Sequence, residues 1–155
     1  MSFAVVNTGA ALPVAPFHRT ACACAADRDN CARPGYLVPG DLERIAEDLG
    51  ATVADILYLF RPGKGAVVMD LSLRTFRIPT IVPRTTGQGC VFQDARGACM
   101  IHAVAPFGCA FFDVHMGQDE ADQRSMWGLN LICRSEPYHD QLESLKNGGD
   151  SCSVS

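Results

Sequence analysis

The 155-residue sequence has the composition of a globular protein, with 48% hydrophobic and 19% charged residues, and its length predicts one domain with a core of moderate size. Its net charge of −4 and the lack of any Lys/Arg run argue against a protein that binds nucleic acid or anionic membranes. There is no basic leader before an apolar stretch and no apolar run of membrane-spanning length. We therefore expect a cytoplasmic protein that binds neither nucleic acid nor a membrane.

The eight cysteines point to metal or redox chemistry. Structural disulfides are rare in a reducing compartment, and a chain of this length does not need them to hold its core. Clustered thiols in such a protein are typical of metal ligands or redox centres. Six of the eight fall into two groups that are distant in sequence, which is how closed metal sites tie a chain together.

The first group consists of Cys22, Cys24 and Cys31. It follows an arm over 1–20 that we expect to be extended, and the polar residues 27–30 allow the backbone to bend within the group. Cys-x-Cys is a weaker signature than Cys-x-x-Cys, because alternate residues point the same way only in an extended segment. His18 is close enough in sequence to serve as a further ligand, although a lone loop histidine is more often solvated.

Two helices are predicted between the cysteine groups. Apolar residues at helical spacing predict the first over 41–49, with Gly50 just past its end. Thr52 and Asp55 form a capping-box pattern, which predicts that a second helix follows at once and continues to Phe60 on its buried face. We interpret both helices as scaffold.

Two strands are predicted next, over 66–71 and 73–78, where β-branched and alternating residues indicate a pair of neighbours in one sheet. Gly87 and Gly89 then allow a close backbone approach before the second cysteine group. Two glycines at this spacing also suit N–H groups that point at sulfur.

The second group consists of Cys90, Cys99 and Cys109. A turn signal over 94–97 separates two short apolar runs and predicts a β-hairpin. With its loop centred between Asp94 and Ala95, Cys90 and Cys99 would be direct cross-strand partners, with Cβ atoms about 4.5 to 5.5 Å apart. Their sulfurs could then reach one metal ion or cluster, and a turn after Pro106 would bring the third. The alternative is a set of inert cysteines in a small core.

The remaining segments are expected to cover the site and complete the core. Phe111 and Phe112 would shield it from water, and 117–124 is predicted as a charged surface segment. A terminal helix is predicted over 138–146, which packs through Leu142 and Leu145.

Two further cysteines lie in this part of the chain. Cys133 is a seventh candidate ligand, with burial in the core as the alternative, and Cys152 is expected to be a bystander in a flexible tail. The predicted organisation is an N-terminal arm over 1–20, a metal-binding domain over 21–146 and a tail over 147–155.

The run from Leu37 to Cys109 resembles the YkgJ-type cysteine-cluster family of zinc- or iron-chelating domains, often labelled as iron-sulfur-cluster-containing proteins. The matching segments are Leu37-Val38-Pro39 with residues 41–50, then Gly89-Cys90-Val91-Phe92, Gly97-Ala98-Cys99-Met100-Ile101 and Pro106-Phe107-Gly108-Cys109. Ala105 stands where the family has Arg, and the first cysteine group is longer than the family's Cys-x-x-Cys-x-x-Cys-Cys. The resemblance covers about half of the chain and implies a metal centre held by cysteines.

These patterns predict an α+β fold, a small single domain of short helices and β-hairpins around a cysteine-ligated metal centre. The candidate metal ligands are Cys22, Cys24, Cys31, Cys90, Cys99, Cys109 and Cys133.

Three functions remain open at this point. The first is an iron-sulfur cluster, expected to be 4Fe-4S, which transfers electrons, senses an oxidant or is delivered to a partner protein. The second is Zn2+ in closed sites of a structural adaptor, since soft sulfur ligands suit both metals. The third is a metalloenzyme whose open site is completed by His102 or His115.

Overall fold

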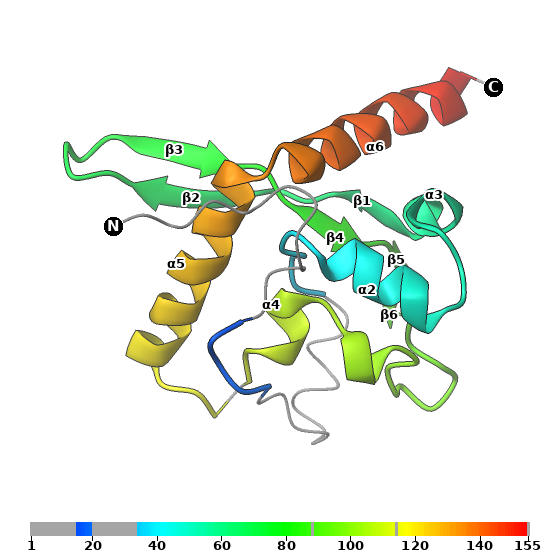
Figure 1. The fold of residues 1–155 in the computed structure, drawn as a ribbon, viewed down its shortest axis with the longest axis horizontal. Coiled ribbons are helices and arrows are strands. Elements are labelled where there is room, and N and C mark those ends of the chain that lie inside the picture. Colours follow the sequence, from blue (N-terminus) through cyan, green and yellow to red (C-terminus); the bar gives the residue numbers. More distant parts are fainter. Residues whose placement is uncertain (1–14, 20–33, 88, 114, 155) are drawn as a thin grey trace.

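The computed structural model describes residues 15–19, 34–87, 89–113 and 115–154, with side chains up to 147. Within these ranges the chain has the predicted α+β fold (Figure 1). Helices pack around three antiparallel sheets of two strands each, whose partners are β1 with β4, β2 with β3 and β5 with β6.

Helix α2 (Asp41–Asp48) confirms the first predicted helix. Leu42, Ile45 and Ala46 are buried, so the expected apolar stripe faces the core. The helix ends before Gly50, which adopts a φ of +67°, a left-handed conformation that glycine reaches without a steric penalty.

Helix α3 (Val53–Ile56) begins with the predicted capping box. The Thr52 hydroxyl accepts a hydrogen bond from the Asp55 N–H at 3.2 Å, and the Asp55 carboxylate accepts one from the Thr52 N–H at 3.0 Å. Two of the N–H groups that a helix start leaves without partners are therefore satisfied.

The prediction that Phe60 ends this helix is wrong. After a 3-10 turn, η1 (Leu57–Leu59), the chain extends as β1 (Phe60–Pro62) and pairs with β4 (Ile81–Pro83). Phe60 is fully buried, and its ring centroid lies 5.6 Å from that of Phe92. Burial against a sequence-distant partner decides this conformation, and local periodicity contains no information about such a partner.

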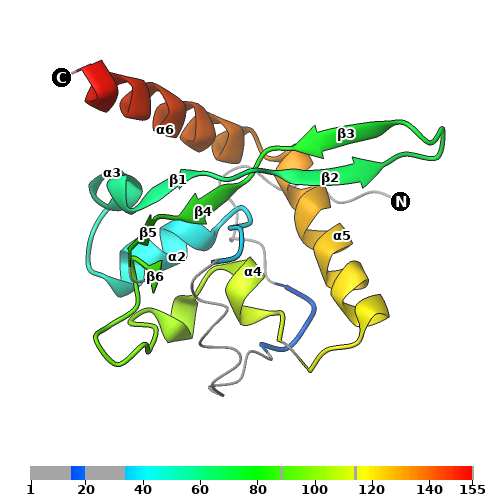
Figure 2. The same cartoon turned by 180° about the vertical axis from the view of Figure 1, so that it is seen from behind.

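The β2–β3 hairpin confirms the next prediction. Strands β2 (Ala66–Met69) and β3 (Thr75–Ile78) pair in antiparallel orientation. Asp70 shapes the turn between them, since its Oδ1 accepts from the N–H groups of Ser72 at 2.8 Å and Arg74 at 3.0 Å. The hairpin projects from one end of the molecule in both views (Figure 1, Figure 2).

The segment of the second cysteine group is built from short elements. Strand β5 (Thr85–Thr86) pairs with β6 (Gly89–Cys90), and a 3-10 turn, η2 (His102–Val104), follows. The turn after Pro106 is a one-turn helix, α4 (Phe107–Ala110), which carries Cys109.

Helix α5 (Gln118–Arg134) includes most of the segment over 117–124, which was predicted as charged surface with no helix assigned. These residues are charged, as expected, yet all but Gly117 lie in the first turns of a 17-residue helix. The buried positions of this helix include Arg124, Leu129 and Ile132. Its first half shows no apolar stripe in the sequence, because the buried position there is an arginine.

Helix α6 (Glu136–Val154) contains the predicted terminal helix over 138–146. Leu142 and Leu145 are buried, as expected. None of the helices in the described ranges is both long and apolar enough to cross a membrane.

The main core contains residues from early and late segments of the described chain, from Leu37 to Leu145. Side chains without exposed surface come from the segment before α2, from α2, β1, β4 and α5: Leu37, Ile45, Phe60, Ile81 and Ile132. The segment over 34–38 is thus held in the centre of the fold, where it borders α4.

Candidate metal centre

Gly35 and Gly108 bring the segment before α2 into direct backbone contact with α4. A Cβ atom on Gly35 would overlap the Gly108 backbone, and one on Gly108 would overlap the Tyr36 nitrogen. The Gly108 N–H donates to the Tyr36 carbonyl at 2.8 Å, which fixes the approach. The same contact lets the Gly35 N–H donate to Cys109 Sγ at 3.2 Å. A hydrogen bond to sulfur favours the thiolate, which is the form that binds metals.

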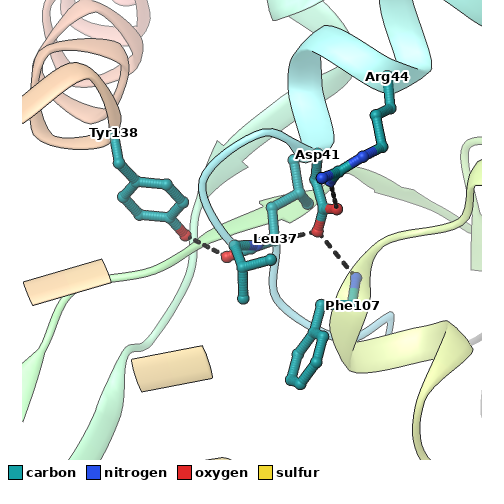
Figure 3. A network of polar contacts seen from close by, with 6 residues as sticks. Leu37, Asp41, Arg44, Phe107 and Tyr138 are labelled. Carbon is teal, nitrogen blue, oxygen red and sulfur yellow. Dashed lines mark hydrogen bonds and ion pairs between the residues drawn. The ribbon is translucent and has the colours of Figure 1, made fainter. Parts of the chain in front are cut away.

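Asp41, the first residue of α2, forms hydrogen bonds to the same two segments (Figure 3). Its Oδ2 accepts from the N–H groups of Val38 and Phe107, both at 2.9 Å, and its Oδ1 lies 3.2 Å from Arg44 Nη1. Burial raises the pKa of the Asp41 carboxyl to about 6, and the two N–H groups and Arg44 oppose this rise. Asp41 therefore holds the first residue of α4, two positions before Cys109.

Tyr138 of α6 anchors the segment over 34–38 from the other side (Figure 3). Its hydroxyl donates to the Leu37 carbonyl at 2.7 Å and accepts from the Ile81 N–H at 2.8 Å. The Leu37 N–H in turn donates to the Ile81 carbonyl at 2.8 Å. The backbone that leads to Gly35 is thus fixed by hydrogen bonds to β4 and α6.

Arg19 connects the cysteines of the second group to the N-terminal part of the chain. Its guanidinium donates to the His102 carbonyl at 2.6 Å and lies 5.6 Å from the centre of the Phe111 ring. Partial burial lowers the pKa of Arg19, while Asp41, Cys109 and Cys99 raise it. Both thiols are therefore within electrostatic reach of one cation.

Cys99 lies at the end of the turn that the sequence predicted. Asp94 Oδ1 accepts from the N–H groups of Arg96 at 2.8 Å and Ala98 at 3.0 Å, which forms a tight turn. Burial raises the pKa of the Cys99 thiol, and the Ile101 N–H and the Arg19 charge act against this rise. Cys99 is thus a partly buried thiol with two groups placed to stabilise its anion.

The predicted pairing of Cys90 with Cys99 is wrong. Cys90 lies opposite Thr85, and Cys99 forms an isolated bridge with Gln93. The Gln93 side chain causes this register, because its Oε1 accepts from the Cys90 N–H at 3.2 Å and its Nε2 donates to the Gly97 carbonyl at 3.1 Å. Hydrogen bonds of the Gln93 side chain across the loop thus take the place of a strand ladder between the two cysteines.

The remaining candidates are distributed as follows. Cys22, Cys24 and Cys31 lie outside the described residues. Cys133 is exposed in the last turn of α5, so its alternative role as a buried core residue is wrong. In the ranges that the structure describes, no three His, Cys, Asp or Glu side chains are grouped so as to hold a metal ion.

The three histidines that were candidate ligands are exposed. Arg19 binds the backbone carbonyl of His102 and Arg124 binds that of His18 at 2.9 Å, so both backbones lie close to this region. His115 follows in the loop before α5, where its N–H donates to Asp113.

An aromatic cluster lies beside Cys109, centred on Phe107. The Phe107 ring is stacked on Phe111 with centroids 5.1 Å apart and meets Phe112 edge-on at 5.5 Å. Trp127 of α5 adds a third contact at 5.2 Å. Phe111 and Phe112 thus pack on Phe107, two positions before Cys109.

Sequence reasoning missed Arg19, Gly35, Asp41 and Trp127. Asp41 was only the first residue of a predicted helix, and Gly35 carried no signal because its role depends on Gly108. The one available hint was that Gly89 and Gly108 directly precede cysteines, since glycine permits the close backbone approach that N–H to sulfur bonds need.

Comparison of the chain with protein-family models, with curated proteins and with solved structures found no match.

Proposed function

We propose that this is a metal-binding cysteine-cluster protein that holds an iron-sulfur cluster through Cys99 and Cys109 together with Cys90 and the first cysteine group. The observation that carries the proposal is the environment of Cys109. Its sulfur accepts the Gly35 N–H and shares one cation, Arg19, with Cys99. Hydrogen bonds to sulfur and nearby positive charge are the means by which proteins stabilise cluster thiolates and set their reduction potential.

Chain connectivity supports a contribution from the first cysteine group. Arg19 and Gly35 flank the range that contains Cys22, Cys24 and Cys31. Gly35 donates to Cys109 Sγ, and the charge of Arg19 acts on both Cys99 and Cys109. Cys22 is three residues from Arg19 and Cys31 is four from Gly35, a reach of at most about 11 and 15 Å for an extended chain. The two described residues that flank this range are thus both related to Cys109, one by a hydrogen bond and one by its charge.

The residues present fit a cluster rather than a hard-cation site. Cys99 and Cys109 are soft donors, each with a backbone N–H directed at its sulfur, from Ile101 and Gly35 respectively. Half-burial and the Phe107 aromatic cluster limit access of water. When bound, such a cluster would supply one-electron chemistry or be passed on to a partner protein.

The test is the colour and metal content of protein purified without oxygen. An iron-sulfur protein is brown and contains iron and acid-labile sulfide, whereas the zinc adaptor of the alternative is colourless and contains only zinc. We expect Cys99→Ser and Cys109→Ser to lose most of the bound iron. Cys152→Ser is the matched control and should keep it, and Cys133→Ser decides whether the seventh thiol is a ligand. Wild-type protein with neither metal would overturn the proposal.

A further inference from the structure

Five of the nine large hydrophobic side chains that are exposed in the described chain lie in the β2–β3 hairpin. Leu71 and Leu73 at its tip are 104% and 77% exposed, and Val67, Met69 and Phe76 on its strands are also exposed. An isolated two-stranded hairpin is only marginally stable in water, and exposed apolar patches usually mark contact surfaces.

The hairpin region is also basic on a protein that is otherwise acidic. Residues 61–78 contain four Lys or Arg and one Asp, which gives this range a charge of +3 and leaves −7 on the rest of the chain. The basic side chains Arg74 and Arg77 are exposed beside the apolar tip. Two such hairpins would repel each other, whereas an acidic surface would complement the charge of this one.

The same chain carries two exposed carboxylates beside a shallow hollow that has one apolar side chain in its lining. A hollow at the end of α2, which we call the α2 hollow, is lined by Arg44, Glu47, Asp48 and Val104. Glu47 and Asp48 are exposed, whereas Arg44 is directed to Asp41 at 3.2 Å. Leu49, next in the chain, adds exposed apolar surface.

We propose that the β2–β3 hairpin of one copy docks in the α2 hollow of a second copy. The hairpin and the end of α2 lie at opposite ends of the molecule in both views (Figure 1, Figure 2). A contact between them is therefore head-to-tail and joins different copies, and it generates open chains or rings of molecules rather than a two-fold dimer. Leu71 and Leu73 supply the apolar contact, and Arg74 and Arg77 face Glu47 and Asp48.

The inference does not depend on the proposed metal centre, and it is tested by sedimentation velocity and light scattering on the full chain. Measurements between about 10 and 500 µM cover the affinity of a small polar-rimmed contact. A reductant is present throughout, so that exposed Cys133 cannot link copies. We expect the mean mass to increase with concentration and the association to weaken at high salt.

Two sets of variants test the two surfaces. Leu71→Ser with Leu73→Asn should weaken association at least tenfold, and asparagine tolerates the φ of +62° at position 73. Met126→Ser, which changes an exposed apolar residue on α5, is the matched control and should associate like wild type. Circular dichroism confirms that each variant is folded.

Charge reversal gives the sharper result. Arg74→Glu with Arg77→Glu, and separately Glu47→Lys with Asp48→Lys, should each abolish self-association. A mixture of the two charge-reversed proteins should associate again, because each then offers the complement of the other. Wild type that stays monomeric throughout the range overturns the proposal. If that monomer sediments with phosphatidylserine vesicles, the hairpin binds an anionic lipid surface instead.

Discussion

Asp41 is the residue on which the geometry around Cys109 depends most directly. Asp41 is 6% exposed, and its carboxylate joins Val38, at the end of the segment over 34–38, to Phe107, at the start of α4. Both hydrogen bonds come from buried backbone N–H groups, which have no water to replace a lost acceptor.

Replacement of Asp41 separates the roles of shape and charge. Asp41→Ala leaves the N–H groups of Val38 and Phe107 without an acceptor, so we expect a loss of about 2 to 4 kcal/mol in the free energy of unfolding. Asp41→Asn keeps an acceptor oxygen and should cost much less. Urea unfolding at pH 7 measures both. Equal losses in the two variants would show that these hydrogen bonds are not what Asp41 contributes.

The raised pKa of Asp41 predicts a pH dependence. The carboxyl binds its proton more tightly in the folded chain, with a pKa of about 6, than in the unfolded chain, where the ordinary value is 3.8. Its contribution to stability is therefore complete below pH 4 and is lost as the pH rises through 6. The stability of wild type relative to Asp41→Asn should fall by up to about 3 kcal/mol between pH 4 and pH 7. A constant difference between the two proteins over this range would contradict the raised pKa.

At the scale of elements, the contact between the segment over 34–38 and α4 decides where Cys109 lies. The contact is possible only because Gly35 and Gly108 both lack a side chain. Tyr138 and Asp41 hold the two sides of it in place.

Gly35→Ala is expected to disrupt this contact. Its methyl group would overlap the Gly108 backbone, which cannot move aside like a flexible side chain, so we expect a loss of more than about 2 kcal/mol in stability and weaker metal binding. The matched control is Gly87→Ala, since a Cβ atom there meets nothing within 4 Å. Thermal unfolding and metal content measure the two effects. A Gly35→Ala protein with wild-type stability would show that the backbone contact is looser than described.

The elements also show what the sequence alone can predict. Helix α2, the capping box of α3 and the β2–β3 hairpin are set by local signals, and these predictions are confirmed. Phe60 and the register of Cys90 were mispredicted because β4 and the Gln93 side chain, respectively, decide them. Helix α5 was missed because its buried residue Arg124 is charged and does not contribute to an apolar period.

The candidate site was predictable only in part for the same reason. Cys90, Cys99 and Cys109 were predicted from spacing and from the family resemblance to share one site, and two of them, Cys99 and Cys109, are within reach of the Arg19 charge. The residues that define their environment, Arg19, Gly35 and Asp41, act through contacts with distant parts of the chain. No local pattern reports contacts of this kind, so these residues could be found only from the structure.

At the scale of the whole molecule, the chain closes on itself beside Cys109. Arg19 approaches from the N-terminal side, the segment over 34–38 passes through the core, and α4 brings Cys109 to both. A metal bound there would join segments that are far apart in sequence, and its binding energy would add to the stability of the fold.

The central claim is that cysteine sulfurs of this chain bind a metal, and X-ray absorption at the metal edge tests it most directly. We predict that protein purified without oxygen gives a first shell of sulfur alone, with iron and with a second shell of iron for a cluster. Zinc with four sulfurs at about 2.3 Å would keep the cysteine site but replace the cluster. A first shell of nitrogen and oxygen, or protein that binds no metal, would contradict the account.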